Sequence, residues 1–155
     1  MAEQEPPVLP SRSALMARIG SKNTKPEMVV RRLLHALGYR FRLHAKELPG
    51  RPDIVFRSKK KAIFVHGCFW HRHSGCSKST TPKTRTEFWS SKFDANINRD
   101  LRNQKDLEKI GWDYLVVWEC EVKDHIKLSA ALQNFLGATV SSIDCHTKLS
   151  IQNHS

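Results

Sequence analysis

Four residues of this chain are typical metal ligands. Three of them lie close together in the spacing C-x4-H-x2-C, and the fourth follows much later: Cys68, His73, Cys76 and Cys120. Three thiolates and one imidazole form a common tetrahedral zinc set, in which one loop wraps the ion and the distant ligand ties that loop to the rest of the fold. Ordinary buried cysteines beside a surface histidine are the alternative. We expect structural zinc. Cys145 does not fit the set and is interpreted as a free thiol.

A second group of residues could perform acid–base chemistry. Asp53 begins one short apolar run, His66 ends the next, and His71 follows five residues later. A carboxylate and a histidine at adjoining strand ends can face one site, where the carboxylate binds Mg2+ and the histidine transfers a proton near neutral pH. A turn aspartate is the alternative for Asp53. Glu27 could reach the same cleft, or could only cap its own helix, and both roles can coexist.

Large aromatic residues lie beside these groups. Phe69 and Trp70 are adjacent, and because side chains alternate along a regular strand we expect one of the two to be exposed. Beside a basic cleft, an exposed ring can wedge between base pairs. Trp89 is a third candidate. Packing into the core is the alternative for all three, and it weighs somewhat more for Trp89.

The overall charge calls for a polyanionic partner. The 155 residues include 26 Lys and Arg against 15 Asp and Glu, a net charge of +11. Such an excess favours nucleic acid first and an anionic membrane second. No apolar run reaches the length of about 18 residues that a spanning helix needs. The acidic, proline-bearing N-terminus lacks the apolar core of a secretory signal. We therefore expect a cytoplasmic protein with reduced cysteines.

The residues that position these groups alternate between helical and strand patterns. A capping box at Thr24 and Glu27 predicts a first helix that ends before Gly38, and a second at Thr84 and Glu87 opens a long polar helix towards Gly111. That helix carries a broken apolar stripe: Phe88, Phe93, Ile97, Leu101, Leu107 and Ile110. Strands are predicted at 39–44, 53–56, 62–65 and 112–118, and Asp124 caps a last helix. The order predicts an α/β fold with a central mixed β-sheet flanked by helices.

One domain is predicted over residues 12–136. Residues 1–11 are proline-bearing and are interpreted as a flexible N-terminal arm. Residues 137–155 are polar and weakly patterned, which indicates a weakly ordered tail.

Four strings of the sequence resemble one known family. They are LPGRPD at 48–53, FVHGCFWH at 64–71, TRTEFW at 84–89 and the segment 111–120. These strings are similar to those of the very short patch repair (Vsr) DNA mismatch endonucleases, and the match runs in order over roughly residues 11–136. The strings are long and unusual, so the resemblance is specific.

The resemblance implies a restriction-endonuclease-like fold with a structural zinc, and an activity. The family nicks one strand on the 5′ side of the T in T:G mispairs that arise by deamination of 5-methylcytosine, and it requires Mg2+. The resemblance assigns Mg2+ binding to Asp53 and the backbone carbonyl of Val65, catalysis to His66 and His71, and general-base action best to His71. With Asp53 and Glu27, placed near the cleft by the sequence itself, these histidines make up the predicted catalytic residues. It assigns zinc to Cys68, His73, Cys76 and Cys120, and DNA intercalation to Phe69, Trp70, Trp89 and Met16.

The implied partner is double-stranded DNA that contains a T:G mispair, with the bacterial nucleoid as the place of action. Mismatch-repair matchmaker proteins are a further partner that the family implies. A monomer is expected, because one nick in an asymmetric mispair does not require two-fold symmetry.

The sequence is compatible with two other functions. A non-catalytic, zinc-stabilised DNA-binding module would explain the charge and the cysteines, but it leaves Asp53, His66 and His71 as coincidence. A nuclease of the same fold that cuts without a mismatch is the other, and the Phe69–Trp70 pair argues against it because wedge residues act best where stacking is already weak.

Overall fold

Four strands form the centre of the computed structural model, which describes residues 22–139. In the sheet they follow chain order: β1 (Arg42–Leu43), β2 (Ile54–Phe56), β3 (Lys61–His66) and β4 (Asp113–Trp118). The pairs β1–β2 and β2–β3 are antiparallel, whereas β3–β4 is parallel. A parallel pair needs a long crossover between its strands. The predicted arm at 1–11 lies outside the described residues, as do residues 140–155 of the predicted tail.

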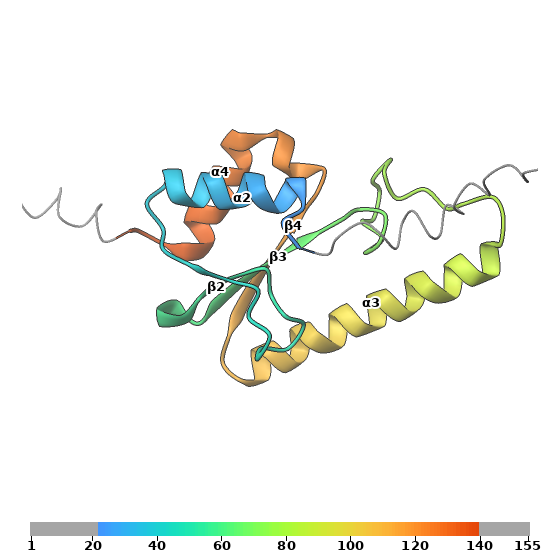
Figure 1. The fold of residues 1–155 in the computed structure, drawn as a ribbon, viewed down its shortest axis with the longest axis horizontal. Coiled ribbons are helices and arrows are strands. Elements are labelled where there is room, and N and C mark those ends of the chain that lie inside the picture. The colour runs from blue at the N-terminus through green and yellow to red at the C-terminus, as the bar shows by residue number, and fades with distance from the viewer. Residues whose placement is uncertain (1–21, 140–155) are drawn as a thin grey trace, which may run out of the picture.

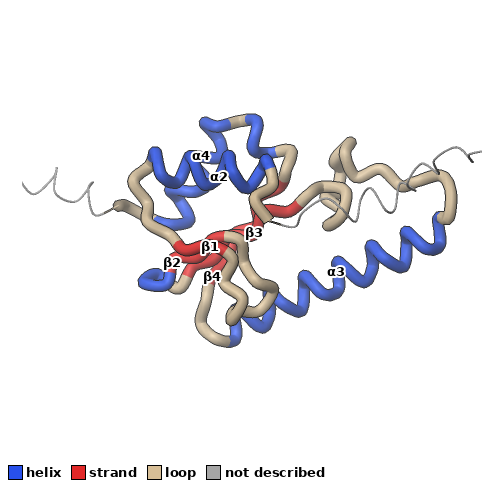
Figure 2. Tube along the Cα trace, viewed as in Figure 1, coloured by secondary structure: helices blue, strands red, loops and turns tan. Residues whose placement is uncertain are grey.

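Helices cover both faces of this sheet. Figure 1 shows α2 (Lys25–Ala36) and α4 (His125–Leu136) together on one side, and the long α3 (Thr86–Lys109) on the other. Short 3-10 turns, η1 (Arg57–Lys59) and η2 (Glu121–Lys123), follow β2 and β4. Figure 2 shows the strands between the two helical layers. The arrangement confirms the predicted α/β fold with a mixed sheet. Among the described residues, no helix is both long and apolar enough to cross a bilayer.

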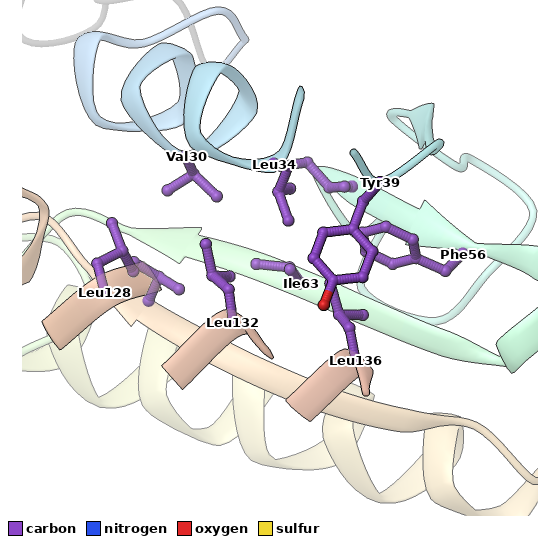
Figure 3. Close-up of a cluster of buried hydrophobic side chains, with 10 residues drawn as sticks. Val30, Leu34, Tyr39, Phe56, Ile63, Leu128, Leu132 and Leu136 are labelled. Atoms are coloured by element: carbon purple, nitrogen blue, oxygen red, sulfur yellow. The ribbon is translucent and has the colours of Figure 1, made fainter. Parts of the chain in front are cut away.

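The core lies on both faces of the sheet. On the α2 and α4 side, leucine and valine side chains from the two helices meet Ile63 of β3 and the rings of Tyr39 and Phe56 (Figure 3). Ala62 and Phe64 point to the opposite face, as the alternation of a strand requires, and pack with Leu107 of α3. Burial on both faces fixes the register of β3, because a slip of one residue would exchange the two sets.

The helix starts were predicted with mixed success. Thr24 caps α2 through a hydrogen bond from the Glu27 amide, and Asp124 caps α4, as expected. The prediction of a second capping box at Thr84 and Glu87 is wrong. Arg85, in a left-handed conformation with φ 53°, precedes α3 and offers no side-chain cap, so the helix begins at Thr86.

The predicted apolar stripe of α3 is also corrected. Phe88, Leu101 and Ile110 are exposed. The residues of α3 that contact the body follow one another at spacings of four and three: Trp89, Phe93, Asn96, Asp100, Asn103 and Leu107. The stripe is apolar at both ends and polar in the middle, because the middle of the helix crosses a polar cleft instead of a core.

Candidate active site and metal centre

The candidate residues gather at one edge of the sheet because of strand direction. β3 and β4 are parallel, with His66 opposite Trp118 in the register. β2 runs antiparallel to β3, so Asp53, just before β2, lies beside the end of β3. Cys68 and Cys120 each follow two residues after a registered partner. The topology therefore joins groups that the sequence separates.

A cavity of about 630 Å³ opens at this edge. Asp53, His66, His71 and Asp100 line it, and so do cationic side chains from three separate segments: Lys22, Lys46, Arg51, Arg99 and Arg102. Acids and cations that line one cavity suit a phosphodiester substrate, because the cations attract the phosphates while the acids can hold a divalent cation.

Asp53 accepts a backbone hydrogen bond from the neighbouring strand. The Val65 amide donates to its Oδ2 at 2.8 Å. Burial raises the pKa of the Asp53 carboxyl to about 6, the Val65 hydrogen bond lowers it, and the nearby Glu27 raises it. The ionised form of Asp53 is unfavourable in these surroundings, and a bound cation would stabilise it.

His66 and His71 lie on top of each other. Their rings stack with centroids 3.8 Å apart and planes 9° apart. The chain between them coils so that the His71 amide donates to the Gly67 carbonyl at 3.1 Å, which returns His71 over the end of β3. Burial, and then the charge of His71, lower the pKa of His66 to about 3, so His66 is neutral at pH 7.

Asp100 of α3 completes this pair. His71 Nδ1 donates to Asp100 Oδ2 at 2.5 Å. Burial alone would raise the pKa of Asp100, but the hydrogen bond and the charge of His71 outweigh it, and the pKa lies below its usual value. An ionised Asp100 orients the ring and leaves Nε2 of His71 as the nitrogen that can accept a proton.

Glu27 of α2 lies beside Asp53, behind the residues that line the cavity. Its side chain is 1% exposed. Oε2 accepts from the Asn23 amide at 2.8 Å, and Oε1 accepts from Nε2 of His44 at 2.8 Å. The donor atoms of Glu27, His44 and Asp53 all lie within 4.8 Å of one another. Glu27 therefore lies beside Asp53 and also binds the chain before α2, although its side chain accepts from the Asn23 amide and not from the Thr24 amide of a capping box.

The four predicted zinc ligands converge. Their donor atoms lie within 4.8 Å of one another. His73 Nδ1 is 3.3 Å from Cys120 Sγ and 3.7 Å from Cys68 Sγ, against about 3.5 Å between sulfur and nitrogen ligands of a tetrahedral zinc. The His73 ring stacks on Trp118 at 4.3 Å, which holds its plane. The donor set and its spacing fit zinc.

The aromatic candidates form one cluster between the loop after β3 and the start of α3. Phe69 contacts Trp70, Trp89 and Phe93 with ring centroids 5.1 to 5.7 Å apart. Trp89 is buried, whereas Phe69 and Trp70 are both partly buried. The expectation of one exposed ring is not met, because this pair lies in a turn, to which strand alternation does not apply.

The structure adds two residues that the sequence analysis missed. Asp100 lies seven residues after Phe93 and seven before Leu107, so it shares their helix face, and that register was the available signal. His44 directly follows β1, a strand of only two residues, and nothing in its local pattern marks it. Met16 and Cys145 lie outside the described residues.

Known proteins match the chain over most of its length. The profile of the family described as DNA mismatch endonuclease Vsr matches residues 9–78. The type II nicking enzyme V.XorIIP of Xanthomonas oryzae pv. oryzae is 54% identical over 125 residues, or 81% of this chain and 91% of that protein. V.NmeAIP of Neisseria meningitidis is 49% identical over 73% of this chain and 80% of its own.

The DNA mismatch endonuclease Vsr of Escherichia coli (strain K12) is 42% identical over 77% of this chain and 76% of its own. Identities of this size over such shares of both chains go far beyond a common fold. The chain therefore belongs to the DNA mismatch endonuclease Vsr family and is a DNA endonuclease.

Proposed function

We propose that this endonuclease nicks one strand on the 5′ side of the T in T:G mispairs that arise from 5-methylcytosine deamination, with Mg2+ as its catalytic cation. The observation that supports this most is the meeting of Asp53 with the His71–Asp100 pair in one cation-lined cavity. A DNA-binding module would need no such meeting. The restriction-endonuclease-like fold of the family agrees with the mixed sheet and its crossover helix.

Mg2+ would be held by Asp53 and by the backbone carbonyl of Val65. In a strand the N–H and C=O of one residue point to the same side. The Val65 amide already donates to Asp53, so its carbonyl faces that side too. Both are oxygen donors of the kind Mg2+ prefers. When bound, the cation would supply positive charge that neutralises the phosphodiester.

His71 would act as the general base. Nδ1 donates to Asp100, which leaves Nε2 to take a proton from the attacking water. The water oxygen then forms a bond to phosphorus while one phosphorus–oxygen ester bond breaks, leaving one cut strand. His66, neutral and stacked on His71, holds the plane of that ring. The cations on the cavity wall would position the backbone.

Zinc at Cys68, His73, Cys76 and Cys120 would have a structural role. Four protein ligands leave no open position, which is the mark of a structural site. The loop that it closes carries His71 between two of the ligands, so a bound ion would also fix the catalytic segment.

Selectivity for the mispair would come from the aromatic cluster. Phe69, Trp70 and Trp89 are proposed to insert beside the mispair, with Met16 entering from the minor groove. Unstacking is cheaper at a mispair than at a Watson–Crick pair, and the difference can supply selectivity. Because Trp89 is buried among rings, insertion would require part of the cluster to open.

The test is strand-resolved nicking. Labelled duplexes that differ only in T:G or T:A are incubated with Mg2+ or EDTA, over a panel of flanking sequences. We expect Mg2+-dependent nicking on the 5′ side of the mispaired T. Equal cutting of both duplexes would favour a mismatch-independent nuclease. Binding without cutting in every context would overturn catalysis.

A further inference from the structure

His44 is hydrogen-bonded to the backbone of Asp53 and to the side chain of Glu27, the two acidic residues beside the proposed cation site. Its backbone amide donates to the Asp53 carbonyl at 2.9 Å. Its ring Nε2 donates to Glu27 Oε1 at 2.8 Å. One residue at the end of β1 therefore connects the segment before β2 with the start of α2.

The backbone of His44 is held in an uncommon conformation. Its φ is 49°, in the left-handed region that side chains disfavour. Such residues persist where neighbouring contacts fix them, and they concentrate at functional sites. Here the contacts lie on both sides of the turn: the His44 amide bonds to Asp53, and the Ala45 amide donates to the Pro52 carbonyl at 3.2 Å.

Glu27 depends on these donors because it is almost completely buried. Oε2 takes the Asn23 amide, and Oε1 faces the His44 ring, with Arg31 further away at 3.5 Å. Glu27 raises the pKa of Asp53, and the charge of His44 lowers it. The His44 ring thus bonds the second carboxylate, and its charge opposes the effect of Glu27 on the pKa of Asp53.

We infer that His44 is a positioning residue that holds the Glu27 carboxylate beside Asp53 and thereby sets the affinity of the Asp53 site for a divalent cation. This rests on the proposed role of Asp53 as the cation ligand. His44 touches neither cation nor substrate in this role, and it acts through Glu27. Hydrogen-bond partners of metal-site carboxylates tune affinity in this way.

The experiment measures Mn2+ binding to the full chain through the electron paramagnetic resonance signal of the free ion. Mn2+ stands in for Mg2+ because both prefer oxygen ligands. His44→Leu should weaken binding by about 10- to 100-fold. His44→Gln should recover most of it, since the Gln amide nitrogen can still donate to Glu27. His125→Leu, an exposed histidine on α4, is the matched control and should bind as the wild type does.

A double-mutant cycle identifies the route of the effect. In a Glu27→Gln background, His44→Leu should weaken Mn2+ binding no further, because the group through which it acts has changed. An equal loss in both backgrounds would overturn the inference, and so would wild-type affinity in His44→Leu. Thermal melting of each variant checks that it is folded. If His44→Leu does not fold, His44→Gln is used for the same comparison.

Failure of this inference is distinguishable from failure of the proposed function. If Asp53→Asn abolishes Mn2+ binding while His44→Leu leaves it unchanged, only the role of His44 is wrong. If Asp53→Asn binds Mn2+ as the wild type does, the cation site itself is misplaced and both proposals fall.

Discussion

Two aspartates of this site have opposite pKa shifts because their neighbours differ. Burial raises the pKa of Asp53 to about 6, and the nearby Glu27 adds to the rise. Asp100 is bonded to His71, and its pKa falls. Environments that separate the pKa values of two like groups also separate their roles. Asp100 keeps its charge and orients the base, while Asp53 is the acid that gains most from a cation.

Asp53→Asn should abolish nicking while leaving DNA affinity largely intact. The same change should stabilise the protein at pH 7.5 in EDTA. The folded pKa of about 6 lies above the ordinary 3.8, so the stability that the protonated acid contributes is present below pH 3.8 and lost as the pH rises through 6. The gain is about 2–3 kcal/mol. Gel shift, nicking and urea unfolding measure the three effects, and surviving Mg2+-dependent nicking would show that the metal site is misassigned.

His66→Asn should make the protein less sensitive to acid. The pKa of His66 falls from 6.5 to about 3 in the fold, so its contribution is present above pH 6.5 and is lost as the pH falls towards 3. Between pH 7 and 5 the wild type should lose about 2 kcal/mol more than the variant. Urea unfolding at both pH values measures this, with His125→Asn as the exposed control. Equal losses in wild type and His66→Asn would contradict the buried, neutral histidine.

At the scale of elements, α3 does three different things along one face. Its first turns pack Trp89 and Phe93 against Phe69, its middle presents Asp100 to His71, and Leu107 near its end joins the core below the sheet. A helix is rigid over this length, so the aromatic cluster and the catalytic pair are held at a fixed separation. The cluster of Cys68, His73, Cys76 and Cys120 joins the loop between β3 and α3 to the segment after β4.

Cys68→Ser should therefore release zinc and destabilise the fold. A structural ion contributes folding free energy directly. A loss of about 3 kcal/mol would lower the melting temperature by roughly 10 °C for a chain of this size. Metal analysis and thermal melting measure both effects, with Cys145→Ser as the matched control. Full zinc content and an unchanged melting temperature in Cys68→Ser would count against the structural role.

At the scale of the whole molecule, the fold concentrates positive charge where the acids are. The chain carries +11 overall, and five of its cations line the one cavity that holds Asp53. They come from the N-terminal side of α2, from the loop before β2 and from α3. Because these cations surround the cavity, we expect the DNA backbone to follow it, and its phosphates to release counterions there.

Arg102→Gln should reduce the salt dependence of DNA binding. Each phosphate contact contributes about 0.9 to the slope of log affinity against log salt concentration. Removing one should lower the slope by about that amount and weaken T:G and T:A duplexes alike, because phosphate contacts carry no sequence information. Lys127→Gln, an exposed cation on α4, should leave the slope unchanged. Equal slopes for both variants would place the DNA elsewhere.

The local pattern was sufficient for much of the fold. The cap at Thr24, the apolar runs of β2 and β3 and the cap at Asp124 each depend on residues within a few positions. The three metal ligands at 68, 73 and 76 could also be predicted from the sequence, because they lie in one short loop. The misplaced start of α3 shows the limit: Arg85 ends the preceding loop in a left-handed conformation, and no side chain caps the helix there.

Tertiary structure alone decided how the site is assembled. Asp100 joins His71 only because the crossover helix passes the sheet edge, and His44 joins Glu27 only because β1 pairs with β2. The register of α3 indicated the face on which Asp100 lies but not its partner, and nothing local indicated His44, because each contact links segments that only folding brings together. The sequence by itself thus determined which kinds of chemistry are available. The parallel pairing of β3 with β4 determined which of these residues meet in one site, because long-range strand register depends on burial of the whole sheet.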